Sequence, residues 1–143
     1  MRLVPPVAAL ALCALLPGCV LDQPSNRTIY SPCHASATGH WRAWVETINI
    51  SQSKVPLHRT FLFVEGQVTV PGEGWQASLD RGPVEQLGEP VQQVIVRTEG
   101  SGGGAPVVRR VTGRFAALKR YGSIAIRCGD GVVATVPDVP RRD

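Results

Sequence analysis

The chain has 143 residues, of which 43% are hydrophobic, and 15 lysines and arginines against 11 aspartates and glutamates give it a formal net charge of +4. This length corresponds to one domain with a modest core. A charge this small does not indicate a nucleic-acid-binding protein, because such proteins present a strongly basic surface. The composition therefore predicts a single small domain with no nucleic-acid partner.

The first eighteen residues have the composition of an export signal. Met1-Arg2-Leu3 carries one positive charge, and an apolar stretch follows from Val4 to Leu16. The stretch fits the apolar region of a signal peptide, about 7–15 residues long, and is shorter than the ~20 residues needed to span a bilayer. We therefore predict that residues 1–18 are removed on export.

The apolar stretch ends in Leu16-Pro17-Gly18-Cys19. Here the sequence resembles bacterial lipoproteins, whose lipobox has Leu, a small residue, Gly or Ala, and then an obligatory Cys. Pro17 departs from the usual Ala or Ser. The resemblance covers residues 1–19 only. It implies that Cys19 receives a diacylglyceryl group and fatty acyl chains such as palmitate, and two or more such chains hold a protein stably on a membrane.

The residue after Cys19 bears on the location. It is Val20, where the lipoprotein family would use Asp for retention in the inner membrane, so the resemblance implies an outer-membrane lipoprotein facing the periplasm. The alternative is an ordinary secreted protein with Cys19 unlipidated. The expected organisation is a signal peptide (1–18), a lipidated cysteine with a flexible tether (19–36) and one all-β domain (37–143).

Once residues 1–18 are removed with Cys13 and Cys19 is lipidated, two cysteines remain, namely Cys33 and Cys128. In an oxidising compartment they are expected to form a disulfide. A catalytic thiol is the competing interpretation, although the chain has no CxxC motif.

From His40 onward, apolar and polar residues alternate in short runs separated by turns. A period of two residues is typical of strands. Breaks are expected at Pro71–Gly74, at Arg81-Gly82-Pro83 and at the glycine-rich loop Gly100–Gly104, and the segment Phe115–Arg120 fits either a helical turn or a continued strand. The predicted strands are Trp41–Ile50, Thr60–Val70, Trp75–Leu79, Val91–Thr98, Val107–Phe115, Tyr121–Cys128 and Val132–Val136.

About seven short strands without a long helix favour a small immunoglobulin-like β-sandwich. A small β-barrel is the alternative, because periodicity does not distinguish an open pair of sheets from a closed one.

No set of residues predicts catalysis, a metal or a cofactor. The histidines His34, His40 and His58 are few for a metal site, which needs three or four converging ligands. Ser101 stands between two glycines but lacks the strand–turn–helix context of a nucleophile elbow. The expectation is a protein that is not an enzyme.

Basic residues without intervening acids concentrate between Gly100 and Gly129. With two tryptophans they form a candidate binding face for an acidic envelope protein or anionic lipid. Adjacent strand residues point to opposite faces, so Arg109 and Arg110 need not act together, and Trp41 and Trp44 have opposite parity. The candidate residues are Trp41, Trp44, Arg109, Arg110, Arg114, Lys119 and Arg120.

These observations favour a lipid-anchored, non-enzymatic binding or assembly module of the cell envelope. A periplasmic enzyme inhibitor or immunity-type protein that inserts the Gly100–Gly104 loop or the Pro71–Gly74 turn into a cleft is the second hypothesis, and a small hydrolase is the third.

Overall fold

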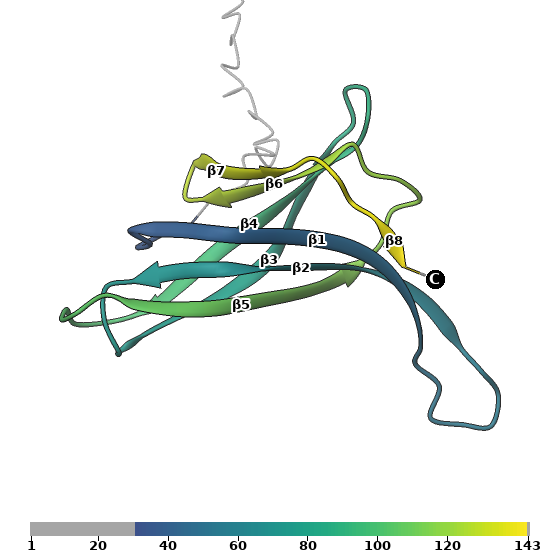
Figure 1. Ribbon diagram of the computed structural model, residues 1–143, viewed down its shortest axis with the longest axis horizontal. Coiled ribbons are helices and arrows are strands. Elements are labelled where there is room, and N and C mark those ends of the chain that lie inside the picture. Colours follow the sequence, from purple (N-terminus) through teal and green to yellow (C-terminus); the bar gives the residue numbers. More distant parts are fainter. Residues whose placement is uncertain (1–30, 143) are drawn as a thin grey trace, which may run out of the picture.

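Eight β-strands build the fold in the computed structural model, which describes residues 31–142 (Figure 1). The alternating sequence pattern accounts for the first seven. The predicted signal peptide, Cys19 and most of the predicted tether lie outside the described residues. The strands are β1 (Ala37–Asn49), β2 (His58–Val70), β3 (Trp75–Glu85), β4 (Val91–Gly100), β5 (Val107–Ala116), β6 (Ser123–Cys128), β7 (Gly131–Val136) and β8 (Arg141–Arg142).

The strands form two four-stranded sheets that pack face to face. Sheet A has the order β5-β2-β1-β8, and sheet B has the order β3-β4-β6-β7. The predicted β-sandwich is confirmed, and the barrel alternative is wrong because the two sheets of the described chain do not close on each other. In sheet B, β4 lies between β3 and β6 and pairs with β6 in parallel, where an immunoglobulin domain pairs its third and sixth strands directly.

The core lies between the sheets and consists of aliphatic side chains. On β2, alternate residues from Leu62 to Val70 are fully buried, and Phe61 and Phe63 alternate with them on the other face. Burial of each such aliphatic side chain contributes about 1.5–3 kcal/mol. The opposing layer is supplied by Val94, Val96, Ile124 and Ile126 of sheet B.

A β-bulge near the start of β1 sets which residues of this strand face the core. The register with β2 shifts between Gly39 and Arg42, and His40 adopts a positive φ of 54°. Trp41 points inward and packs so closely on Gly66 that a Cβ added to Gly66 would lie 2.2 Å from the indole ring. The indole N–H donates to the Thr38 hydroxyl oxygen at 3.1 Å.

The segment before β1 is fastened to both sheets. Cys33 forms the predicted disulfide with Cys128 at the end of β6, with the two Cα atoms 5.2 Å apart. The backbone N–H of His34 donates to the Thr98 hydroxyl in sheet B, and that of Ser36 donates to the Thr69 carbonyl in sheet A. The end of the predicted tether is therefore held across the sandwich.

The distal ends of β1 and β2 extend beyond the sandwich as a two-stranded ribbon (Figure 1). β5 accompanies β2 only as far as Phe61, and β8 pairs only with Val45 and Glu46 of β1. Residues 47–60, which we call the hairpin arm, therefore pair with each other along their strands, apart from the Thr60 carbonyl, which accepts from the Ala117 N–H at 3.2 Å.

The structure adds to or differs from the predicted elements at three places. β3 does not stop at Leu79 but continues through Gly82 and Pro83 with a second bulge between Arg81 and Val84. This is possible because β3 is an edge strand, where proline is tolerated. Phe115 and Ala116 continue β5, so the helical alternative for this segment is wrong. β8 has too few residues for a periodic signal, and it forms because the Pro140 carbonyl accepts from the Val45 N–H at 2.8 Å.

Loss of the disulfide is expected to lower stability substantially. The bond closes a loop of 95 residues, for which the chain-entropy model gives about 4–5 kcal/mol. The exchange of both Cys33 and Cys128 to Ala should lower the guanidinium midpoint measured by tryptophan fluorescence. Reductant should lower the midpoint of the wild type to the same value and leave the variant unchanged. Equal midpoints for the oxidised wild type and the variant would contradict the expectation.

Gly66→Ala is expected to destabilise the fold by about 1–3 kcal/mol, because the added methyl group overpacks against Trp41. Gly39→Ala is the matched control, since nothing lies within 4 Å of its added Cβ, and its effect should stay within about 0.5 kcal/mol. Chemical denaturation of both variants measures the difference. Similar losses for both would mean that the Trp41–Gly66 contact has no special role.

Candidate binding face

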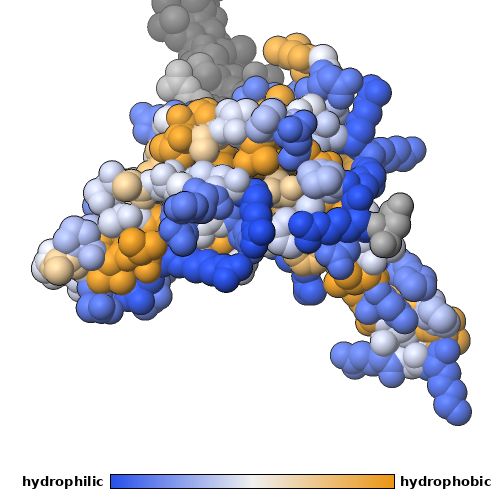
Figure 2. Space-filling view, in the orientation of Figure 1, coloured by the Kyte–Doolittle hydropathy of each residue, from blue (hydrophilic) through white to orange (hydrophobic). Residues whose placement is uncertain are grey.

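The outward side of sheet A carries a mixed set of arginine, aromatic and glutamate side chains, which we call the outer face. Strand alternation places these side chains opposite the buried core positions of β1, β2 and β5. Figure 2 shows hydrophilic side chains gathered over the middle of these strands. The outer face comprises Arg42, Trp44 and Glu46 of β1, Phe61, Phe63, Glu65 and Gln67 of β2, Arg110, Thr112 and Arg114 of β5, and Arg142 of β8.

Aromatic rings form the centre of the outer face. Trp44 lies opposite Phe63 in the ladder, and their rings stack with centroids 5.4 Å apart and an interplanar angle of 9°. Phe61 meets Phe63 edge to face at 6.4 Å. The Trp44 indole N–H donates to the Glu46 carboxylate at 3.0 Å, which fixes the orientation of the ring.

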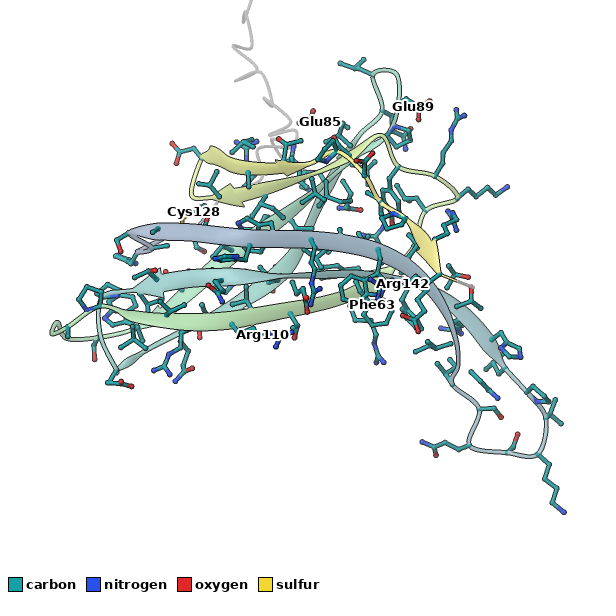
Figure 3. The ribbon with its side chains drawn as sticks, viewed as in Figure 1. Phe63, Glu85, Glu89, Arg110, Cys128 and Arg142 are labelled. Carbon is teal, nitrogen blue, oxygen red and sulfur yellow. A yellow bond between two sulfur atoms is a disulfide. The ribbon has the colours of Figure 1, made fainter. Side chains whose placement is uncertain are left out.

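Arginines cover the outside of this aromatic group. The guanidinium of Arg142 lies 4.5 Å from the Trp44 ring centroid, and that of Arg114 lies 5.0 Å from the Phe61 ring. Such cation–π contacts contribute about 0.5–1 kcal/mol each at exposed sites. Phe63 and Arg142 lie near the β8 end of sheet A, while Arg110 lies farther along β5 (Figure 3).

A second cluster follows along the strands, where one buried carboxylate holds two arginines. Glu65 lies directly opposite Arg42, and its two oxygens accept from Arg42 Nε and, at 3.0 Å, from an Arg110 terminal nitrogen. The Glu65 side chain is 11% exposed, whereas those of Arg42 and Arg110 are 63% and 69% exposed. One carboxylate thus positions two solvent-facing guanidinium groups.

The cluster of Glu65 with Arg42 and Arg110, which we call the Glu65 cluster, borders an open hollow of about 450 Å³ at the β1 bulge. His40 and Gln67 contribute to its lining beside the Glu65 cluster. The hollow lies beside the bulge, where His40 and Trp41 both stand opposite Gly66 in the ladder.

The outer face has an excess of positive charge, with four arginines and two glutamates. Arg114 makes no ion pair with a carboxylate among the described residues, so its donors face solvent and the Phe61 ring. Exposed guanidinium groups that are held in place by aromatic and carboxylate neighbours are suited to bind carboxylates or phosphates of a partner, because little side-chain freedom is lost on binding.

The structure separates the residues that the sequence grouped into one candidate face. Trp44, Arg110 and Arg114 lie together on the outer face. Trp41 points to the core, and Arg109 lies on the opposite side of β5 from Arg110, so neither belongs to this face. Arg109 instead donates to the Glu73 and Trp75 carbonyls and to the Glu73 carboxylate.

Lys119 and Arg120 lie in the loop between β5 and β6 and not on the sheet. The Leu118 N–H donates to the Tyr121 hydroxyl at 2.8 Å, and Arg141 donates to the carbonyls of Leu118 and Lys119. Burial raises the pKa of the Tyr121 hydroxyl above 10.0, its ordinary value, so it stays protonated at neutral pH. The loop is thus fastened through its backbone while the two basic side chains are exposed.

Eight residues of the outer face were missed by the sequence argument, namely Arg42, Glu46, Phe61, Phe63, Glu65, Gln67, Thr112 and Arg142. Parity within β1 and β2 indicates that Arg42, Phe61, Phe63 and Glu65 share a side with Trp44, but only the register of the two strands places them in adjacent rows. Arg142 had no sequence signal, because it follows the last predicted strand.

The described residues contain no group of three or more histidine, cysteine, aspartate or glutamate side chains that would hold a metal ion. His34 packs against Trp75 with ring centroids 4.7 Å apart and the ring planes tilted by 43°, His40 lies at the bulge, and His58 lies in the last strand pair of the hairpin arm, next to its loop. Within residues 31–142, no histidine ring hydrogen-bonds to a hydroxyl or thiol, and no helix has the length and hydropathy of a bilayer-spanning segment.

The two loops expected to protrude are bound to each other. The Trp75 indole N–H donates to the Gly102 carbonyl at 2.8 Å, and added Cβ atoms at Gly72 and Gly74 would meet the carbonyls of Gly103 and Ser101. The hairpin arm, by contrast, projects from the sandwich (Figure 1).

Comparisons with protein-family models, with curated proteins and with solved structures give no match to this chain.

Glu65→Gln is expected to destabilise the protein by about 1–3 kcal/mol, because the amide nitrogen turns a donor toward an arginine and one buried charge partner is lost. Asp80→Asn is the control. It removes the charge from the Asp80–Arg97 pair, whose side chains are 42% and 44% exposed, and should cost less than about 1 kcal/mol. Urea unfolding of both variants tests this. A cost for Glu65→Gln no larger than that of the control would show that the Glu65 cluster adds no stability.

Proposed function

We propose that the protein is a lipid-anchored, non-enzymatic binding module of the cell envelope that uses the outer face of sheet A to hold an acidic surface of an envelope protein. Cys19 provides the membrane attachment, and the outer membrane facing the periplasm is the proposed location. The hypothesis of a small hydrolase is set aside in favour of binding.

The arginine-covered aromatic row on the outer face carries this proposal. It combines Trp44 and Phe63 with the exposed guanidinium groups of Arg114 and Arg142 on one sheet surface. Aromatic and arginine side chains are the types that contribute most to protein interfaces. Two further guanidinium groups, held by Glu65, extend the same charge along β1 and β5.

Membrane attachment is tested with Cys19→Ser in the full-length chain. The wild type should incorporate a labelled fatty acid and partition into the detergent phase, and the variant should do neither. Equal labelling of both chains, or of neither, would refute the anchor without bearing on the binding face.

The binding face is tested by a photo-crosslinking residue at Thr112, an exposed outer-face position of β5. A discrete protein adduct formed in cells identifies the partner for purification. The double exchange Arg114→Glu and Arg142→Glu should then weaken binding by more than tenfold at low salt. Screening should reduce this difference as the ionic strength rises, because the charges are exposed.

The matched control is Lys119→Glu with Arg120→Glu, which changes net charge equally but lies in the β5–β6 loop. It should change affinity by less than about threefold. Equal losses in both double variants would mean that net charge, and not the outer face, determines binding. Adducts with lipid alone, together with sedimentation on phosphatidylglycerol vesicles, would assign the face to anionic lipid.

A further inference from the structure

The hairpin arm presents exposed apolar side chains on a projecting element. Val55 is 73% exposed and Leu57 is 50% exposed, and both lie in the loop between β1 and β2 (Figure 1). The arm has no neighbouring strand beyond Phe61 on the β5 side, so it makes little contribution to the core. Aliphatic side chains placed this way add nothing to the stability of the sandwich and are available to a partner.

The loop at the end of the arm is ordered by its own side chains. The backbone N–H groups of Ser51 and Leu57 both donate to the Asn49 side-chain oxygen, at 2.9 and 3.2 Å. Those of Ser53 and Val55 donate to the hydroxyl oxygens of the serines two positions earlier, at 3.1 and 3.4 Å. The alternating pattern from Asn49 to Val55 therefore satisfies every second loop N–H while the apolar side chains stay outside.

This arrangement lowers the cost of binding. A loop whose backbone is already held in one conformation loses less entropy when it enters a partner than a free loop of the same length does. The strand pairing that supports it continues to the last pair, Asn49 with His58, and the Ile50 N–H donates to the Leu57 carbonyl at 2.8 Å.

The charge of the arm indicates which kind of residue surrounds the cleft of the partner that it would enter. Residues 47–60 contain Lys54 and Arg59 and no aspartate or glutamate. Both basic side chains are exposed and flank the apolar pair along the chain. A complementary partner therefore has an apolar cleft with an acidic rim.

We propose that the hairpin arm is a pre-ordered insertion element whose loop, with Val55 and Leu57 at its contact surface, enters an apolar, acid-rimmed cleft of a protein. The proposal assigns a second surface, separate from the outer face of sheet A, and does not depend on it. A membrane surface fits the arm less well, because interfacial insertion favours aromatic side chains and residues 47–60 contain none.

The position of the arm supports a protein partner further. β1 starts shortly after Cys33 and runs away from the disulfide for 13 residues, which is about 40 Å at 3.3 Å per residue. The arm therefore lies at the end of the molecule opposite Cys128 (Figure 3). An anchor N-terminal to Cys33, as in the proposed function, places the contact surface of the arm far from the attached end of the domain.

The test places a photo-crosslinking residue at position 55 of the full-length chain in cells, with position 87 as the matched control. Leu87 is fully exposed in the loop between β3 and β4, also a hairpin loop. A discrete protein adduct at 55 and its absence at 87 is expected. No adduct at 55, equal adducts at both positions, or adducts with lipid only would overturn the proposal.

The adduct partner is then purified and titrated with purified variants. Leu57→Ser should weaken binding by more than tenfold, while Leu87→Ser should leave it within about threefold, and both should keep the melting temperature because the side chains are exposed. Equal affinities for Leu57→Ser and the wild type would overturn the assignment of the contact surface. The Arg114→Glu and Arg142→Glu double variant separates the two proposals, since a partner of the arm alone is bound unchanged by it.

Asn49→Ala tests the role of loop order. Removal of the shared acceptor should accelerate amide hydrogen exchange at Ser51 and Leu57 and weaken binding, although Asn49 itself need not touch the partner. Faster exchange with unchanged affinity would show that pre-ordering is not part of recognition.

Discussion

One extra residue in β1 determines the arrangement of sheet A. Between Gly39 and Arg42, β1 has one residue more than β2, so two residues of β1 lie opposite Gly66. A one-residue shift in register exchanges the two faces of a strand. Without the bulge, Arg42 and Trp44 would face the core and the small apolar residues between and after them would face solvent. The buried layer and the outer face therefore both depend on this irregularity.

The bulge is held from both sides of the sheet. On the inner side, the Trp41 ring covers Gly66 and donates to Thr38. On the outer side, the next pair of the ladder is Arg42 with Glu65, whose ion pair also recruits an arginine from β5. The core contact and the surface cluster are adjacent steps of one ladder. The Trp41 contact and the Glu65 cluster therefore both border the hollow at the bulge.

The sequence predicts those features that depend on local alternation of apolar and polar residues. It does not predict strand bounds or side-chain neighbours that depend on tertiary contacts. Seven strands and the disulfide follow from period and cysteine count. The continuation of β3 through Gly82 and Pro83 depends on its edge position, and β8 depends on pairing with β1, so neither has a local signal. Parity separates Arg109 from Arg110 correctly, whereas the meeting of Trp44 with Phe63 requires the register between two strands.

The β1–β2 hairpin contributes side chains to the core, to the outer face and to the arm. Which of these a residue joins depends on how many strands lie beside the hairpin at that point. Where β5 accompanies it, inward side chains are buried under sheet B and outward ones are fixed in rows by a third strand. Past Phe61 that support ends, and order is supplied by the side chain of Asn49 and the serines that follow. The proposed recognition groups on the outer face are thus held in place because they stand on a core, while those of the arm are held because the loop side chains bind its own backbone. A partner that contacts both surfaces would follow the ribbon around the bend where it leaves the sandwich (Figure 1).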